Sequence, residues 1–277
     1  MNKKITSAFL TIILIFLILA AIGIYKSAQW QTLGLFSLVA VVWLIGVLVL
    51  IKKPTWSWFG LLLFLLSWGV FPLMSFITKY VLPWSADSLL EQIDRKIWAG
   101  HILSDFLRYE EYPVFSDLIT ACYFFFYFLV VGSVIYFTIH RKKLIGIVFF
   151  NAIITLYLIG FIGYICLPAA GPAFTISPQV GGGGQLTQSI TKMVNDGVTG
   201  MDVFPSLHTA ISLFIVGYLW QIGLRKISIC IFPITLGTVF ATIFLRYHYG
   251  IDMLCGVLIA IGMLFLSAQW LNNQQKT

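Results

Sequence analysis

The hydrophobicity pattern of this chain consists of long apolar stretches separated by short breaks that are polar, charged or rich in glycine and proline. A bilayer-spanning helix needs about 20 mostly apolar residues. Eight stretches meet that length, at about residues 5–25, 30–51, 56–82, 114–139, 144–167, 207–224, 227–247 and 249–271. Their apolar residues recur with a helical period and do not alternate, which argues against a β-barrel. The pattern predicts an all-α fold, a polytopic membrane helix bundle of about eight transmembrane helices.

Composition supports this class of protein. Of the 277 residues, 60% are hydrophobic and only 10% are charged, and the mean hydropathy is +0.96. A soluble domain carries roughly 25% charged residues. The first apolar stretch lacks a clear cleavage site, so we interpret it as a retained membrane anchor. The four cysteines fall within the predicted spans and are expected to be buried apolar residues, without metal-site or disulfide spacing.

The net charge of +7 is distributed in a way that predicts orientation. Short loops rich in Lys and Arg stay cytoplasmic. With the N-terminus inside, alternate breaks return ten cations and no acidic residue to the cytoplasm, namely Lys3, Lys4, Lys52, Lys53, Arg141, Lys142, Lys143, Arg225, Lys226 and Lys276. We therefore predict a multi-pass protein of the cell membrane (inner or plasma) with both termini cytoplasmic. A nucleic-acid partner is not expected, because the cations are not clustered with interleaved aromatic residues.

Two external segments join the predicted spans. In residues 83–112, the run Ser88–Glu91 resembles a capping box that starts an amphipathic helix in the outer interface. We interpret this segment as a lid or strut in preference to a direct substrate contact. Residues 168–205 contain a glycine run at 181–184 and a short amphipathic stretch near 190–194. A loop of this length is usually functional or mobile.

Two short motifs carry the candidate chemistry, Phe204–His208 and Arg246–Asp252. The topology brings both to the extracytoplasmic face, where an ionisable group is a functional candidate. Asp252 follows His248 by four residues, so on a helix the two side chains would point the same way and the carboxylate would fix the imidazole tautomer. Ser206 is suited to cap the next helix, whose free N–H groups favour an anion. The set predicts a phosphoryl site with one nucleophilic and one proton-donating histidine.

The other two histidines and a possible metal site have simpler interpretations. His101 and His140 are each expected to be interfacial side chains without chemistry. A His/His/Asp metal site needs three convergent ligands, and Asp252 is better placed to support His248 than to bind a metal independently. We therefore expect no metal and no organic cofactor.

The same motifs resemble those of the type 2 phosphatidic acid phosphatase superfamily. The run Phe204–His208 is similar to its second motif, P-S-G-H, and the run 241–252 to its third, S-R-x5-H-x3-D. The Ser-Leu-His and Tyr-His-Tyr-x-x-Asp versions look most like the branch with the inositol phosphorylceramide synthases. The resemblance implies a six-helix catalytic core within residues 55–277, with residues 1–54 as two additional N-terminal helices.

The resemblance also implies a mechanism without a cofactor. His248 would attack phosphorus to form a phosphohistidine, Asp252 would orient it, and His208 would protonate the departing oxygen and then deprotonate water or an alcohol. Ser206 and the amides that follow it would hold phosphate oxygens.

Departures from the family pattern bear on the substrate. In the first motif, K-x6-R-P, Tyr164 stands for the lysine and Gly171 for the arginine while Pro172 is kept; in the third, Thr242 stands for the arginine. Arg246 would supply one replacement cation, and Lys192 or a residue of 83–112 another. The candidate phosphate- and substrate-binding residues are Ser206, Arg246, Tyr164, Gly171, Pro172 and Tyr247.

Fewer cations suit a phosphodiester, which carries one negative charge, over a monoester, which carries nearly two. We expect a lipid phosphotransferase or phosphatase that passes a phosphoryl or phospho-head group from a lipid phosphate or phospholipid to an alcohol or water. The alternative is a lipid phosphomonoester phosphatase of the phosphatidate or polyprenyl phosphate type. A lipid transporter, a structural subunit and a haloperoxidase fit less well. The oligomeric state is not predicted, because no strong small-xxx-small interface is present.

Overall fold

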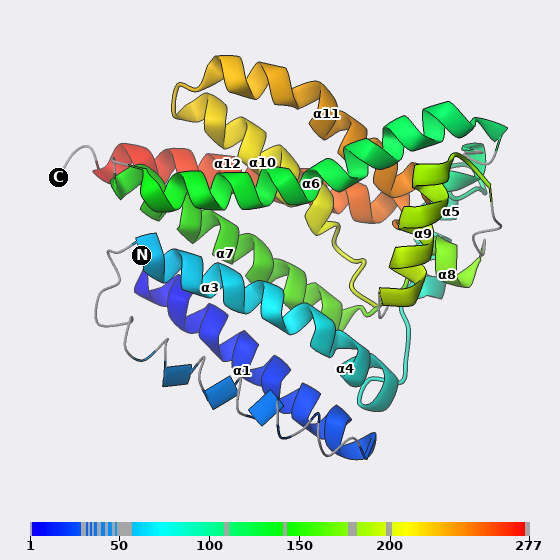
Figure 1. Ribbon diagram of the computed structural model, residues 1–277, viewed down its shortest axis with the longest axis horizontal. Helices are drawn as coiled ribbons and strands as arrows, with labels where there is room; N and C mark the ends of the chain where they lie inside the picture. Colours follow the sequence, from blue (N-terminus) through cyan, green and yellow to red (C-terminus); the bar gives the residue numbers. More distant parts are fainter. Residues whose placement is uncertain are drawn as a thin grey trace. The chain divides into compact units, whose positions relative to one another are not determined.

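The computed structural model describes residues 2–28, 57–107, 111–140, 143–176, 182–197 and 201–274, with some single residues between 32 and 48. It is 83% helical, and the residues that it describes form no strand. The helices are α1 (Lys3–Lys26), α3 (Ser57–Val70), η1 (Phe71–Leu73), α4 (Met74–Tyr80), α5 (Asp87–Ile97), η2 (Leu103–Phe106), α6 (Pro113–Ile139), α7 (Lys143–Cys166), α8 (Pro172–Thr175), α9 (Gln185–Gly197), α10 (Leu207–Gln221), α11 (Arg225–Phe244) and α12 (Gly250–Gln274) (Figure 1).

The described helices confirm an all-α, polytopic membrane protein. Six helical segments are long and apolar enough to cross a bilayer: Lys3–Lys26, Trp58–Tyr80, Pro113–Ile139, Lys143–Cys166, Arg225–Phe244 and Gly250–Asn273. A seventh predicted span is the shorter apolar helix α10. The predicted span 30–51 lies mainly outside the described residues.

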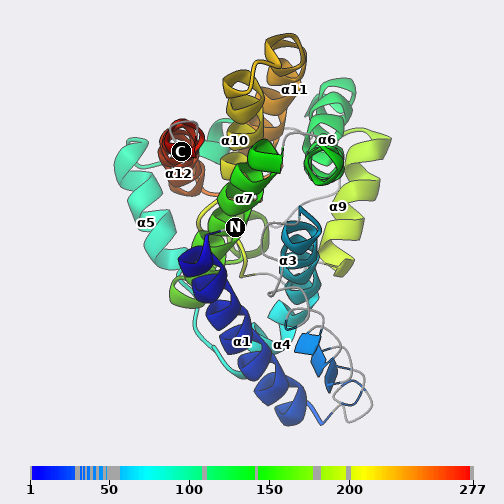
Figure 2. The same ribbon diagram turned by 90° about the vertical axis from the view of Figure 1, so that its left-hand side faces the viewer.

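Contacts divide the chain into two compact units. The first contains residues 1–84, 134–162 and 266–277. In it α1 packs beside α4 and α3 (Figure 2). The approach is close because Gly23 has no side chain, and a Cβ there would overlap the backbone of Phe76. The indole N–H of Trp68 donates to the hydroxyl of Tyr157 at 2.6 Å, which ties α3 to α7.

The second unit contains residues 85–133 and 163–265, and every candidate site residue belongs to it. Helices α10 and α11 run side by side as a hairpin (Figure 1). The start of α9 is fastened to α6, since Thr187 N donates to Asp117 Oδ1 at 2.8 Å and Gly184 N to Ser116 Oγ at 2.8 Å. The described residues of the segment 168–205 include the two helices α8 and α9.

Two local predictions were wrong. The capping box proposed for Ser88 and Glu91 does not form, because α5 already begins at Asp87 and its N-cap residue is Ala86. The amide of Asp87 instead donates to the hydroxyl of Ser85 at 3.0 Å. The cysteines are not buried either: Cys166 and Cys230 are exposed, and Cys122 and Cys255 are partly exposed, because the long apolar helices bury only part of their surface within the protein.

Candidate active site

The motif Phe204–His208 forms a tight helix start. Ser206 is fully buried and is the N-cap of α10, where its hydroxyl accepts the N–H of Thr209 at 3.3 Å. His208 is the second residue of the helix. The amide of Ser206 donates to the backbone carbonyl of Asp252 at 3.3 Å, so the two motifs are joined directly through their main chains.

The third motif is a turn that closes α11. The amides of Tyr247 and His248 both donate to the carbonyl of Thr242 at 3.0 Å, and Arg246 adopts a left-handed φ of 63°. Thr242 is fully buried, and its hydroxyl donates to Val239 O at 2.7 Å. The residue at the family's arginine position therefore supports the turn that carries His248.

His248 and Asp252 meet at the start of α12. Nδ1 of His248 lies 3.5 Å from Oδ2 of Asp252, and their side chains are 5% and 0% exposed. The same carboxylate oxygen accepts the N–H of Tyr249 at 2.9 Å. The helix α12 begins only at Gly250, so His248 and Asp252 do not share one continuous helix. Their proximity arises instead from the turn at His248 and the first residues of α12.

The second imidazole lies close to the first. The ring centroids of His208 and His248 are 5.9 Å apart at an angle of 66°. Within the described part of the chain, three polar atoms here are buried without a hydrogen-bond partner: Nε2 of His208, Nδ1 of His248 and Oδ1 of Asp252. Buried polar groups normally find partners. Nδ1 of His248 faces the carboxylate of Asp252, so the unused capacity that suits a ligand is that of His208.

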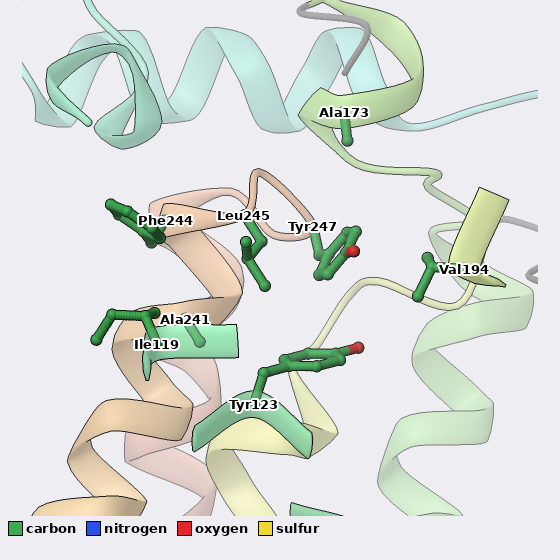
Figure 3. Close-up of a cluster of buried hydrophobic side chains, with 8 residues drawn as sticks. All are labelled: Ile119, Tyr123, Ala173, Val194, Ala241, Phe244, Leu245 and Tyr247. Atoms are coloured by element: carbon green, nitrogen blue, oxygen red, sulfur yellow. The ribbon is translucent and has the colours of Figure 1, made fainter. Parts of the chain in front are cut away.

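Aromatic side chains of α6 surround His208, which the sequence reasoning missed. Tyr123 stacks on the imidazole at 5.0 Å and 25°, and the ring of Phe126 lies at 4.4 Å. Tyr123 also contacts Tyr247 at 5.2 Å, and Figure 3 shows their hydroxyls directed to the same side. The available signal was a pair of tyrosines, Tyr123 and Tyr127, in a phenylalanine-rich span.

The first family motif packs against the third. Gly171 adopts φ 93°, and a Cβ at this residue would overlap the carbonyl oxygen of Tyr247. Pro172 is the first residue of the short helix α8. Tyr164 is 2% exposed near the end of α7. Arg246 is partly buried, and its carbonyl accepts the N–H of Ala173 at 2.8 Å.

Two carboxylates of α5 also reach this region, and neither was identified from the sequence. Asp87 accepts the N–H groups of Ala170 and Gly171 at 2.9 and 2.8 Å and the hydroxyl of Tyr249 at 3.0 Å. Asp94 accepts the N–H groups of Gly250 and Ile251. An acidic residue between apolar positions of an amphipathic helix is ordinarily a solvated one, so the pattern gave no signal.

A further carboxyl group, that of Asp202, precedes the motif Phe204–His208 by two residues. Burial raises its pKa above the ordinary aspartate value of 3.8, and the nearby His248 partly opposes that rise. Asp202 thus lies within electrostatic range of the imidazole.

The surroundings of the other residues considered from the sequence are as follows. His101 is 57% exposed, with Nδ1 3.8 Å from Asp105. His140 follows the end of α6 and contacts Tyr136. Lys192 is exposed on α9. In the ranges that the structure describes, no three His, Cys, Asp or Glu side chains are grouped as metal ligands would be.

A family model described as the PAP2 superfamily matches residues 89–266. The match covers more than half of the chain, so the protein belongs to the PAP2 superfamily. Membership indicates a phosphatase or phosphotransferase, and the six long apolar helices among the described residues indicate a multi-pass membrane protein. No curated protein and no solved structure matches the chain.

Proposed function

We propose that the protein is a lipid phosphotransferase or phosphatase that works through a phosphohistidine at His248. The single observation that carries the proposal is the arrangement of three side chains, two of them buried: His248 Nδ1 lies 3.5 Å from Asp252, and the ring of the partly buried His208 lies 5.9 Å from that of His248. A carboxylate beside Nδ1 holds a proton there and leaves Nε2 with its lone pair. Nε2 of His248 is therefore the nucleophilic atom.

The reaction proceeds in two displacements. Nε2 of His248 attacks phosphorus, the P–N bond forms as the P–O bond to the leaving group breaks, and protonated His208 gives its proton to the departing oxygen. In the second displacement, neutral His208 removes the proton of water or an alcohol as that oxygen attacks phosphorus. The P–N bond breaks, and both histidines return to their starting states without any cofactor.

Phosphate oxygens are held by neutral donors for the most part. The start of α10 at Ser206 offers backbone N–H groups, which favour an anion at a helix N-terminus. The hydroxyl of Tyr247 and the guanidinium of Arg246 belong to the turn that carries His248. Because family cations are replaced at Tyr164, Gly171 and Thr242, the site suits the single charge of a phosphodiester.

The preferred reaction is therefore transfer of a phospho-head group from a phospholipid to a lipid or sugar alcohol, with water as a competing acceptor. Hydrolysis of a lipid phosphomonoester is the second candidate, and the replacement cation Arg246 favours it. The Ser-Leu-His and Tyr-His-Tyr-x-x-Asp sequences of this chain resemble those of the inositol phosphorylceramide synthase branch. The cation distribution supports cytoplasmic termini and an extracytoplasmic site, and the apolar surroundings support sideways entry of the lipid from the bilayer.

The test compares two reactions of the protein reconstituted in vesicles. One assay follows release of inorganic phosphate from a lipid monophosphate, and the other follows transfer of a labelled head group from a phospholipid to an added lipid alcohol. We expect transfer to dominate and to be lost in His248→Ala, while His101→Ala, the matched histidine control, keeps it. Fast monoester hydrolysis without transfer would contradict the phosphodiester preference.

A further inference from the structure

Helix α5 is amphipathic, yet two of its acidic side chains are buried. Asp87 is 6% exposed and Asp94 is fully buried, whereas Glu91 between them is paired with Arg95 on the outer side. Burying a charge is costly unless hydrogen bonds compensate for it. The compensation here comes from backbone groups of the catalytic segments.

Asp94 caps α12 from a different helix. Its carboxylate accepts Gly250 N at 3.1 Å and Ile251 N at 2.8 Å, and it also accepts Leu103 N at 3.2 Å. Unpaired N–H groups at a helix start carry partial positive charge, so a carboxylate is a well-matched partner. Both amides of α12 lie between His248 and Asp252 in the chain.

The close approach of α5 depends on Gly250. A Cβ at this position would come within 2.6 Å of Trp98 Nε1 and 3.0 Å of Asp94 Oδ1. No larger residue would leave the carboxylate room to reach the two amides. Both residues thus contribute to the contact, because Asp94 supplies the carboxylate and Gly250 leaves room for it.

Asp87 holds the other side of the same turn. Through Ala170 and Gly171 it fixes the loop that packs on the Tyr247 carbonyl, and through the Tyr249 hydroxyl it fixes the residue directly after His248. The two carboxylates of α5 therefore restrain the turn from its two ends.

We propose that Asp94, supported by Asp87, is a positioning residue that sets the geometry between His248 and Asp252. This inference rests on the proposed function of the pair. It changes the interpretation of residues 83–112 from a lid or strut to a part of the catalytic framework. Small displacements of reacting groups lower the reaction rate by large factors. Substitution of Asp94 should therefore change kcat more than KM.

The substitutions are Asp94→Asn and Asp94→Ala, with Glu91→Gln as the control. All three replace an acidic residue of α5, but Glu91 is paired with Arg95 of the same helix. We expect kcat for head-group transfer to fall about tenfold in Asp94→Asn and about a hundredfold in Asp94→Ala, with KM within about twofold of wild type. Glu91→Gln should keep both constants.

The split between kcat and KM, measured together with the amount of folded protein, separates positioning from a general structural role. Displacement of His248 relative to Asp252 lowers kcat per folded molecule. Loss of folded protein alone lowers the total activity and leaves kcat per folded molecule at the wild-type value.

Hydrogen exchange of the peptide that covers 247–254 gives a measurement independent of turnover. We expect faster exchange at Gly250 and Ile251 in Asp94→Ala and wild-type exchange in Glu91→Gln. An Asp94→Asn protein with wild-type kcat would overturn the inference. A wild-type protein with no turnover would instead contradict the proposed function, and wild-type exchange in Asp94→Ala would then overturn the positioning role by itself.

Discussion

The carbonyl oxygen of Tyr247 occupies the space in which a side chain at Gly171 would begin. Gly171 stands where the family motif has an arginine, and its φ of 93° is one that L side chains rarely adopt. The missing arginine is therefore explained by backbone packing, because the loop approaches the turn of His248 too closely for any Cβ.

Restoring the family residue should not restore a cation to the site. We expect Gly171→Arg, and also Gly171→Ala, to displace the turn and lower transfer activity at least tenfold, with a lower thermal unfolding midpoint in detergent. Head-group transfer and thermal unfolding, measured on the same preparations, provide the check. A Gly171→Arg protein with raised phosphatase activity would contradict this account of the turn.

The ring and the hydroxyl of Tyr123 are expected to contribute separately. The ring stacks on His208, so Tyr123→Ala should lower kcat about tenfold by loosening the imidazole. Tyr123→Phe retains the stacking and removes only the hydroxyl, so its effect on kcat should be smaller than that of Tyr123→Ala. Steady-state kinetics of the two variants provides the measurement, and equal losses in both would show that the hydroxyl matters more than the ring.

The elevated pKa of Asp202 gives a prediction for stability. A carboxyl that binds its proton more tightly in the folded state stabilises the fold at low pH, and this contribution is lost as pH rises from the ordinary value of 3.8 through the elevated one. Replacing Asp202 by Asn removes the cost of the partly buried charge. We expect Asp202→Asn to raise the unfolding midpoint at pH 7 and to match wild type below pH 3.8. A lower midpoint at pH 7 would mean that attraction to His248 exceeds the burial cost.

Much of the fold followed from hydrophobicity alone, because each membrane span is a local property of about 20 residues. The proximity of His248 and Asp252 could also be predicted locally, because they are only four positions apart in the chain, although a turn and not one continuous helix brings them together. The role of α5 was not accessible in this way, since Asp94 and Gly250 are 156 positions apart. Asp94 looks like a surface acid until its backbone partners are known.

Tyr123 and the start of α5 illustrate two other limits. A tyrosine in a phenylalanine-rich span fits a packed helix equally well, and only the fold brings it against His208. The capping-box pattern at Ser88 had a competitor three residues earlier, because the Ser85 hydroxyl satisfies the Asp87 amide and lets the helix begin sooner.

The central claim is tested most directly by trapping the covalent intermediate. Wild type, His248→Ala and His208→Ala would be mixed with a phospholipid labelled at phosphorus, quenched in alkali and digested for mass spectrometry. The account predicts an acid-labile phospho-head group, joined through phosphorus, on the peptide that contains His248 in wild type and none in His248→Ala, with slower formation and decay in His208→Ala. Turnover by wild type without any labelled peptide, or labelling that persists in His248→Ala, would contradict it.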